Sequence, residues 1–432
     1  MRTLLRDRSY RRLLVGQTLS AFGDHAMFLA LAVWVKSLTG SNAKAGLAIL
    51  PFVLPSLFGP VLGVYVDRFP RRRVMVATDL AAALCLLPLL WVHDASDIWL
   101  IYAASFLLGI ATVVYDAARA GLLVSLVPGD ELGDANGLLQ STNQAMRLLA
   151  PLVGAALFAL IGGQAVAVVD AVTFVVSALF LLGVAAPSIE RPEENDFWSE
   201  LRAGLHHIVH TSDVRRLTIA TLFVTLAAGL LEIMIFALID QGLHRPPEFL
   251  GVLSTTQGVG AVVGGVIVGK AIKRLGELPT IAWALIAAGI GVALLATADI
   301  WIVLAATVFV GIAVSFYNVA FITLVQRSTD VSMQGRVMSA IEAVFTVPYA
   351  ASLAAGALIV GIASFQTVFV LEGVAFVAIA VYLAITIRGT GVTPPTPSTG
   401  RTRRRERDRS SSRGARALAA PPQRSPGRHP TP

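Results

Sequence analysis

The sequence predicts an all-α polytopic membrane protein in which twelve transmembrane helices form two six-helix bundles. Three observations support this prediction: long apolar segments, cations confined to alternate connections, and an internal repeat. Of the 432 residues, 55% are hydrophobic and 14% are charged, whereas a soluble domain usually carries about 25% charged residues. The composition therefore excludes an ordinary soluble domain.

Twelve apolar segments are each long enough to cross a bilayer core of about 30 Å as a helix. Helices are expected because a helix satisfies its own backbone hydrogen bonds in lipid. The first segment is basic and then apolar, as in a signal peptide, but it is too long and contains Asp24, so it is interpreted as a retained helix. The predicted spans are 13–38, 44–66, 74–93, 97–119, 138–161, 164–186, 217–240, 249–270, 279–298, 300–325, 338–362 and 366–387.

Lys and Arg residues gather in every second connection, and this distribution predicts the orientation of the spans. The alternate connections hold few cations, so both termini are predicted to face the cytoplasm, with the protein in the plasma (inner) membrane. The connections rich in cations are residues 2–12, 67–73, 187–216, 270–274, 327–336 and the tail 388–432.

Four regions follow from this pattern: a first bundle (1–186), a cytoplasmic linker (187–216), a second bundle (217–387) and a basic tail (388–432). The apolar residues Phe197, Leu201, Leu205 and Ile208 of the linker predict an amphipathic helix on the inner membrane surface. The tail is rich in Arg, Pro, Ser and Gly and is predicted to be disordered. It is interpreted as a segment near anionic lipid, and no nucleic-acid partner is expected.

The two halves of the chain align at a constant offset of 202 residues. A parallel repeat of this kind predicts two bundles related by an axis along the membrane normal, with a binding site between them near the midplane. This architecture is typical of a transporter that works by alternating access. The matching positions include Asp97 with Asp299, Trp99 with Trp301, Tyr115 with Tyr317, Gly154 with Gly356, and Asp170 with Glu372.

Three charges deep in predicted spans are the main candidate site residues. Asp24 lies about eleven residues into the first span, or about 16 Å at 1.5 Å per residue, and Glu232 lies in the corresponding helix of the second half. A carboxyl group near the midplane is costly, so both are candidates to carry a proton or to pair with a cation. Arg147 could pair with either acid or bind an anionic substrate, and His25 is interpreted as a polar neighbour of Asp24.

Other polar residues in the spans have two open interpretations. One group lines the cavity or packs helices together: Asn143, Tyr115, Gln257, Tyr317 and Asn318. Asp170 and Glu372 are interpreted as structural or interfacial. Four charges near inner ends form a network there or extend to the membrane surface: Asp79, Asp116, Arg119 and Glu342.

No metal site or cofactor is expected, apart from the proton as coupling ion. The single cysteine, Cys85, cannot form an internal disulfide. His206 and His210 have the spacing of a metal-binding pair but lack a third ligand, so they are interpreted as solvated surface residues.

The loop "GVYVDRFPRRR" resembles motif A of the major facilitator superfamily, with Gly63, Asp67, Arg68, Arg71 and Arg72 at the motif positions. The resemblance implies charge-assisted bonds at the cytoplasmic mouth that form in the outward-facing state and break in the inward-facing one. In the second repeat Asp67 is replaced by Gly269 whereas the cations remain, so Asp67 is predicted to belong to the gate.

The fifth span is similar to motif C of drug–proton antiporters, a helix-packing motif, through Gly137, Pro151 and Gly154. The phrases "GQTLSAFGD" and "FWSELRAGLHHI" resemble the enterobactin-exporter-like and macrolide-efflux-like branch. This resemblance implies efflux of a small amphipathic molecule, such as a drug, macrolide-like compound or siderophore, in exchange for protons. It also implies a monomer in the lipid bilayer.

Two other functions stay open at this point. One is a proton-coupled importer of the same fold, and the other is a non-transport membrane enzyme or sensor. No nucleophile–base pair or metal set in the sequence supports an enzyme.

Overall fold

The computed structural model describes residues 4–66, 68–128, 131–185, 197–329 and 333–388, and within these ranges all regular secondary structure is helical. The all-α fold predicted from the sequence is therefore confirmed. Ten of the described helices are long and apolar enough to cross a membrane, which agrees with a polytopic membrane protein. Residues 389–432, the predicted disordered tail, lie outside the described part of the chain.

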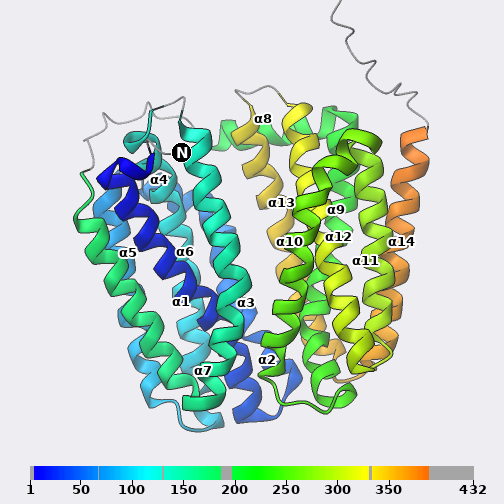
Figure 1. Ribbon diagram of the computed structural model, residues 1–432, viewed down its shortest axis with the longest axis horizontal. Helices are drawn as coiled ribbons and strands as arrows, with labels where there is room; N and C mark the ends of the chain where they lie inside the picture. Colours follow the sequence, from blue (N-terminus) through cyan, green and yellow to red (C-terminus); the bar gives the residue numbers. More distant parts are fainter. Residues whose placement is uncertain (1–3, 67, 129–130, 186–196, 330–332, 389–432) are drawn as a thin grey trace, which may run out of the picture. The chain divides into compact units, whose positions relative to one another are not determined.

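The first bundle contains the helices from α1 to α7 (Figure 1). Helix α1 covers the first predicted span, and α5 with the short helix η3 covers the third. The bounds are η1 Leu4–Arg6, α1 Arg8–Thr39, α2 Asn42–Leu47, α3 Ile49–Val53, η2 Leu54–Phe58, α4 Gly59–Val66, α5 Arg71–Leu86, η3 Leu87–Trp91, η4 Ala95–Asp97, α6 Ile98–Leu126 and α7 Leu132–Leu182.

The second bundle contains the helices from α9 to α14, with the linker helix α8 at one end (Figure 1). Each predicted span of this half corresponds to one long helix, and α9 continues into the π-helical turn η5. The bounds are α8 Phe197–His210, α9 Ser212–Ala237, η5 Leu238–Gly242, α10 Phe249–Leu275, α11 Glu277–Leu295, α12 Ile300–Arg327, α13 Gln334–Ile359 and α14 Phe365–Arg388.

The second predicted span, 44–66, is a chain of short helices from α2 to α4 instead of one continuous helix. Proline causes the breaks because it lacks a backbone N–H and its ring clashes with the carbonyl four residues earlier. Pro51 disrupts the helix at Leu47, where α2 ends, and Pro55 lies at the start of the 3₁₀ helix η2. The junction residues Ala48, Leu54 and Gly59 all keep right-handed helical φ and ψ, so the backbone stays helical although its hydrogen-bond pattern changes along the segment.

The fifth and sixth predicted spans are joined in α7, which has 51 residues and a single non-helical position inside it. This position is Gly162, with φ 80° and ψ 173°, a backbone conformation that a residue with a Cβ rarely adopts. It lies in the two-residue gap between the predicted spans. The next residue, Gly163, lies so close to the Trp34 ring of α1 that a Cβ there would overlap it. The gap between the fifth and sixth predicted spans is therefore a sharp bend in α7, and the glycine at position 162 permits it.

Close helix contacts define the two bundles. Helix α1 packs along α7, and Gly154 of α7 lies against the backbone of Ala26. In the second half, α9 packs along α13, where Gly356 lies against Ile233. Since Gly154 and Gly356 are repeat partners, the same packing contact occurs once in each bundle.

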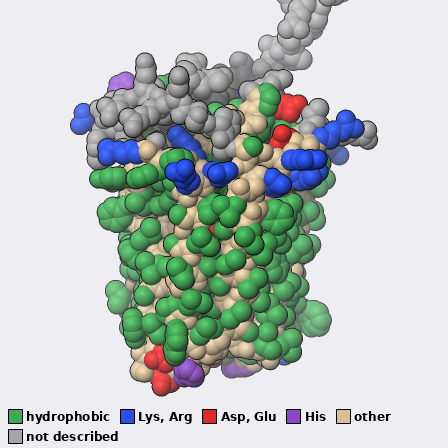
Figure 2. Space-filling model, turned by 90° about the vertical axis from the view of Figure 1, so that its left-hand side faces the viewer, with side chains coloured by type: hydrophobic (Ala, Val, Ile, Leu, Met, Phe, Trp, Pro, Cys, Tyr) green, Lys and Arg blue, Asp and Glu red, His purple; other side chains and the backbone are tan. Residues whose placement is uncertain are grey.

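The surface in Figure 2 carries a broad band of hydrophobic side chains between two polar ends. Lys and Arg side chains gather at one end, whereas acidic and histidine side chains are visible at both ends. Large hydrophobic side chains that are exposed include Leu84, Leu160 and Leu179. Large apolar side chains exposed in this number require a lipid environment in place of water.

Candidate functional site

Five polar side chains meet where the two bundles face each other, and we call them the central cluster. They come from both bundles and are His25 on α1, Asn143 and Arg147 on α7, Glu232 on α9 and Tyr349 on α13. The Tyr349 hydroxyl donates a hydrogen bond to Oε2 of Glu232. Arg147 lies close enough to interact electrostatically with both of these residues. The cluster therefore couples α7 of the first bundle to α9 and α13 of the second.

Helix geometry explains how α7 contributes two members of the central cluster. Asn143 and Arg147 are four residues apart, so they lie on the same face of α7. Asn143 lies close to His25, and Arg147 interacts with His25 electrostatically. The Nε2 atom of His25 is buried and has no hydrogen-bond partner in the described part of the chain. A group of this kind is available to a ligand or a water molecule.

These contacts resolve two questions that the sequence left open. The carboxylate beside Arg147 is Glu232, and His25 joins this cluster through Asn143. Tyr349 was missed by sequence reasoning because a single tyrosine in an apolar span carries no motif. Its position deep in the eleventh predicted span is the only signal that could have indicated it.

Asp24 lies in a second group, the acid cluster, which we define as Asp24, Asp79, Asp116 and Asp170. Asp79 and Asp116 interact electrostatically with Asp24, as does Asp170. The four carboxyl groups come from four helices of the first bundle, α1, α5, α6 and α7. When ionised, these carboxyl groups carry like charges and repel one another.

The side chains around the acid cluster are polar but few. Arg119 forms an ion pair with Asp116 at 3.0 Å, one turn along α6. Asp79 is buried, with Ser177 beside its carboxyl group. The hydroxyl of Tyr115 is also buried near Asp79 and Asp24, and it makes no hydrogen bond within the described residues. Tyr115, a predicted cavity residue, thus belongs to this cluster.

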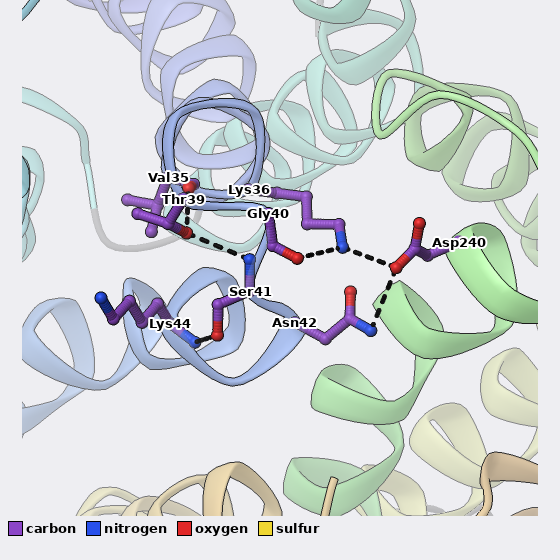
Figure 3. Close-up of polar contacts among 8 residues, drawn as sticks. All are labelled: Val35, Lys36, Thr39, Gly40, Ser41, Asn42, Lys44 and Asp240. Atoms are coloured by element: carbon purple, nitrogen blue, oxygen red, sulfur yellow. Dashed lines mark hydrogen bonds and ion pairs between the residues drawn. The ribbon is translucent and has the colours of Figure 1, made fainter. Parts of the chain in front are cut away.

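Near the end of the molecule at which α2 lies, an ion pair connects the bundles (Figure 3). Nζ of Lys36, in the last turn of α1, lies 2.7 Å from Oδ2 of Asp240 in η5. The same Nζ donates to the Gly40 carbonyl at 2.8 Å, at the C-terminus of α1, where the helix dipole favours a cation. The Asn42 amide lies 3.5 Å from Asp240. We call Lys36, Asn42 and Asp240 the Lys36 latch.

Between the Lys36 latch and the central cluster, apolar side chains of the two bundles pack against each other. Ile49, Ile233 and Leu353 form a small buried core from both bundles. Gly46 of α2 lies against Ile233 so closely that a Cβ there would overlap it. The bundles are therefore in tight contact at this end.

Towards the opposite end, the facing side chains are accessible. Arg147 and Asn318 are exposed, as are Asp116 on α6 and Glu342 on α13. Glu342 and Asp116 lie close enough to interact electrostatically although they belong to different bundles. Two acids that face each other without a joining ion pair do not hold the bundles together at this end. Of the four charges predicted near inner ends, Asp79 and Asp116 belong to the acid cluster and Arg119 pairs with Asp116. Glu342 lies on the second bundle, near Asp116.

Two of the remaining predicted cavity residues support helix packing. The Tyr317 hydroxyl forms a hydrogen bond with the Thr221 hydroxyl, which joins α12 to α9. Gln257 lies at the close approach of α10 and α12, where its carbonyl contacts Gly311. Neither belongs to the central cluster.

The cation-rich loop between α4 and α5 holds parts of the first bundle together. The Arg72 guanidinium donates to the Val184 carbonyl at 2.8 Å, and Arg12 donates to the carbonyl of Gly183. Both carbonyls follow the last turn of α7, where backbone acceptors lack helical partners. Arg71 packs against Gly121 of α6.

Other positions of the loop are less constrained. The Arg68 guanidinium lies over the Tyr65 ring at 5.3 Å. Among the described residues, no atom lies within 4 Å of the position a Cβ would take on Gly63. Asp67, the predicted gate residue, lies outside the described residues, so its role stays a prediction.

The predicted packing motif of the fifth span is only partly a packing site. Gly154 contacts Ala26 of α1, and the carbonyl of Pro151 lies against Gly251 of α10, in the other bundle. Gly137 has no neighbour within 4 Å of an added Cβ in the described part of the chain.

The linker helix α8 packs against α9 and α13 through the buried side chain of Ile208. The His206 and His210 rings stack at 3.8 Å. Among the described residues no group of three or more His, Cys, Asp or Glu side chains could hold a metal ion. The side chains of Phe197 and Leu201 lie outside the described part of this helix.

Comparison with known proteins identifies related families. The model of the Major Facilitator Superfamily matches residues 13–241 and 217–426. Macrolide efflux protein A of Streptococcus pyogenes is 24% identical over 383 residues, covering 85% of this chain and 93% of that protein. The lysophospholipid transporter LplT of Photorhabdus laumondii is 33% identical over 151 residues, which is 35% of this chain and 36% of that protein.

Solved structures share the fold. One is a bacterial homologue of the iron transporter ferroportin in an inward-facing state, with a TM-score of 0.69 at 18% identity, covering 88% of this chain and 98% of that one. Another is the POT family transporter PepTSo, with a TM-score of 0.72 at 13% identity and the same coverage. At these identities the likeness concerns the fold alone.

Proposed function

Because the chain belongs to the Major Facilitator Superfamily, we propose that it exports a small amphipathic molecule in exchange for protons, by alternating access. The related proteins are membrane transporters, not enzymes. The likeness to macrolide efflux protein A along most of both chains favours a macrolide-like or other drug-like substrate. Such an activity would contribute to multidrug resistance. No cofactor is involved, and the protein acts as a monomer without nucleic acid.

The topology we propose has twelve spans with both termini in the cytoplasm of the plasma membrane. In this assignment α7 supplies two spans, because Gly162 reverses the chain, and the segment from α2 to α4 supplies one. The end rich in Lys and Arg faces the cytoplasm, in agreement with the positive-inside rule. The regions 1–186, 187–216, 217–387 and 388–432 are then the two bundles, the linker and the cytoplasmic tail.

The observation that carries the proposal is the central cluster, because its members come from both bundles. A site shared by two bundles changes its surroundings when the bundles rock, as alternating access requires. Glu232 is the proton-carrying group in this proposal. Its neutral form loses the attraction of Arg147, and Arg147 can then meet the substrate or the Asn143 side chain.

The acid cluster around Asp24 serves as a second proton site, within the first bundle. One proton that enters at a membrane potential of 100 mV supplies about 2.3 kcal/mol. This energy corresponds to an almost fifty-fold concentration of a neutral substrate. A single proton is therefore sufficient for useful efflux.

The conformation fits an inward-facing state under this topology. The Lys36 latch and the core of Ile49, Ile233 and Leu353 close the outer half of the seam. Arg147 and Glu342 are accessible from the cytoplasmic half. In the outward-facing state the latch opens, and the loop at 63–72 contributes to closing the other end.

The test is the uptake of a tritiated macrolide into inside-out membrane vesicles with an acidic interior. An exporter accumulates the macrolide as protons leave, whereas Glu232→Gln is expected to abolish proton-driven accumulation. Glu248→Gln is the matched control, since its side chain does not cap α10 and it lies outside both clusters.

Three results would change the proposal. Native accumulation in Glu232→Gln would remove the coupling role of Glu232. Proton-driven loss of preloaded macrolide, instead of uptake, would indicate import. No flux of any compound from a broad drug and siderophore panel would favour a sensor.

A further inference from the structure

A cavity of about 780 Å³ lies on the second bundle, away from the central cluster, between α9 and α14. Its walls are almost wholly apolar, and they include Phe223 and Ala227 of α9 and Leu371 and Ala375 of α14. Phe223 and Leu371 are exposed on the surface. Because both lie in the hydrophobic part of membrane-spanning helices, the cavity opens towards the bilayer.

One carboxyl group lines this apolar cavity. Glu372 of α14 is only 4% exposed, and neither of its carboxylate oxygens has a hydrogen-bond partner among the described residues. A buried acid without a partner is costly in any protein interior, and more so within a membrane. The acid therefore points to a group that the cavity receives from outside.

The repeat partner of Glu372 has a different environment. Asp170 of α7 lies directly against Gly23 of α1, where even a Cβ would overlap it, and the Thr173 hydroxyl lies 3.3 Å from its Oδ1. No space for a ligand exists at that position. The two acids were both interpreted as structural from the sequence, but only Asp170 is packed in this way. Glu372 lines a cavity, whereas Asp170 is packed against a neighbouring helix.

We propose that this cavity binds a lipophilic amine from the bilayer, with the ammonium group paired to Glu372 and the apolar body against α9 and α14. Three properties support this ligand class. A cationic donor would stabilise the ionised form of Glu372. The rest of the lining is apolar apart from Thr367 and Tyr382. The volume is in the range of about 300–1,000 Å³ that holds drug-sized ligands. The proposal concerns binding at the lipid-facing surface and does not depend on the direction or coupling of transport.

Photoaffinity labelling of the full chain in nanodiscs tests the proposal, because covalent mapping separates a bound probe from one dissolved in lipid. The probe is dodecylamine with a diazirine in its chain, and the matched probe is the corresponding dodecanol. We expect amine adducts on peptides of α9 and α14. Glu372→Gln should raise the amine concentration for half-maximal labelling about tenfold or more, since a charge-assisted bond is lost. Labelling by the alcohol should not change.

Two further variants keep the test decisive. Asp170→Asn removes the repeat partner and should label like the native protein. Ala227→Phe fills the cavity and should abolish labelling by both probes although Glu372 is retained. The thermal unfolding midpoint of each variant verifies folding, and these measurements require no transport.

The outcomes separate the interpretations. Equal labelling by amine and alcohol, or native labelling in Glu372→Gln, would overturn the proposal. Weaker amine labelling in phosphatidylethanolamine nanodiscs than in phosphatidylcholine would assign the ammonium to a membrane lipid. Equal labelling in both would assign it to a free amine.

Discussion

The Lys36 latch makes a quantitative prediction about the equilibrium between the two conformations. Asp240→Asn removes the charge that faces Lys36 at 2.7 Å. Lys36 is 7% exposed and Asp240 is 48% exposed, so the pair is neither fully buried nor a surface pair. Loss of one partner of a buried pair costs about 3–5 kcal/mol, whereas exposed pairs contribute about 1 kcal/mol or less. Because Asp240 is half exposed, we expect the loss of this ion pair to destabilise the closed latch by about 1–2 kcal/mol, between these two limits.

This free energy stabilises only the conformation in which the latch is closed. Its loss should therefore change the ratio of open to closed molecules about five- to thirtyfold. The Gly40 carbonyl still accepts from Lys36 in the variant, which keeps the expected effect at the lower end.

The assay is a distance measurement by pulsed electron paramagnetic resonance. Spin labels at Ser96 and Thr297, which are both exposed near the same end of their bundles, report opening of that end in a Cys85→Ser background. Asp240→Asn should increase the population at the longer distance. The control is Asp299→Asn, because Asp299 caps α12 within its own bundle and asparagine caps equally well. The same distance distribution in Asp240→Asn and in the native protein would refute the reasoning.

Three other variants test separate contacts. Gly154→Leu should lower the thermal unfolding midpoint strongly, because the side chain overlaps Ala26 of α1 and overpacking costs about 1–3 kcal/mol or more; an unchanged midpoint would contradict the close packing. Arg72→Ala should lower the free energy of unfolding by about 1–2 kcal/mol, because it removes the hydrogen bond to the Val184 carbonyl. Arg72→Lys should restore part of this stability. Equal unfolding midpoints in the native protein and both variants would argue against that bond. Asp67→Asn should leave membrane insertion intact and reduce macrolide flux in vesicles, so normal flux would remove Asp67 from the gate.

Much of the fold is readable from the sequence because lipid imposes simple rules on a chain. Apolar length identifies the helices, and the gap before Gln164 coincides with the bend at Gly162. The division of the second span into short helices was not predicted, although Pro51 and Pro55 are present in the sequence. The repeat offset also identifies Gly154 and Gly356, which make equivalent contacts in the two bundles.

The site is less predictable because its contacts join residues far apart in the chain. Glu232 and Arg147 are conspicuous because charges are rare in apolar spans. Tyr349 is not conspicuous, and its hydrogen bond to Glu232 spans 117 positions. No sequence pattern marks Lys36 as part of a site, yet it is buried and pairs with a residue 204 positions away. Tertiary packing decides such pairs, and a single sequence does not contain it.

The bonds from Arg12 and Arg72 to the carbonyls after α7 have a mechanical consequence. They connect the beginning of α1, the beginning of α5 and the end of α7, all within the first bundle. In the proposed rocking of the two bundles, these three chain segments are expected to move together. The arginines thus make that end of the first bundle a stiff body.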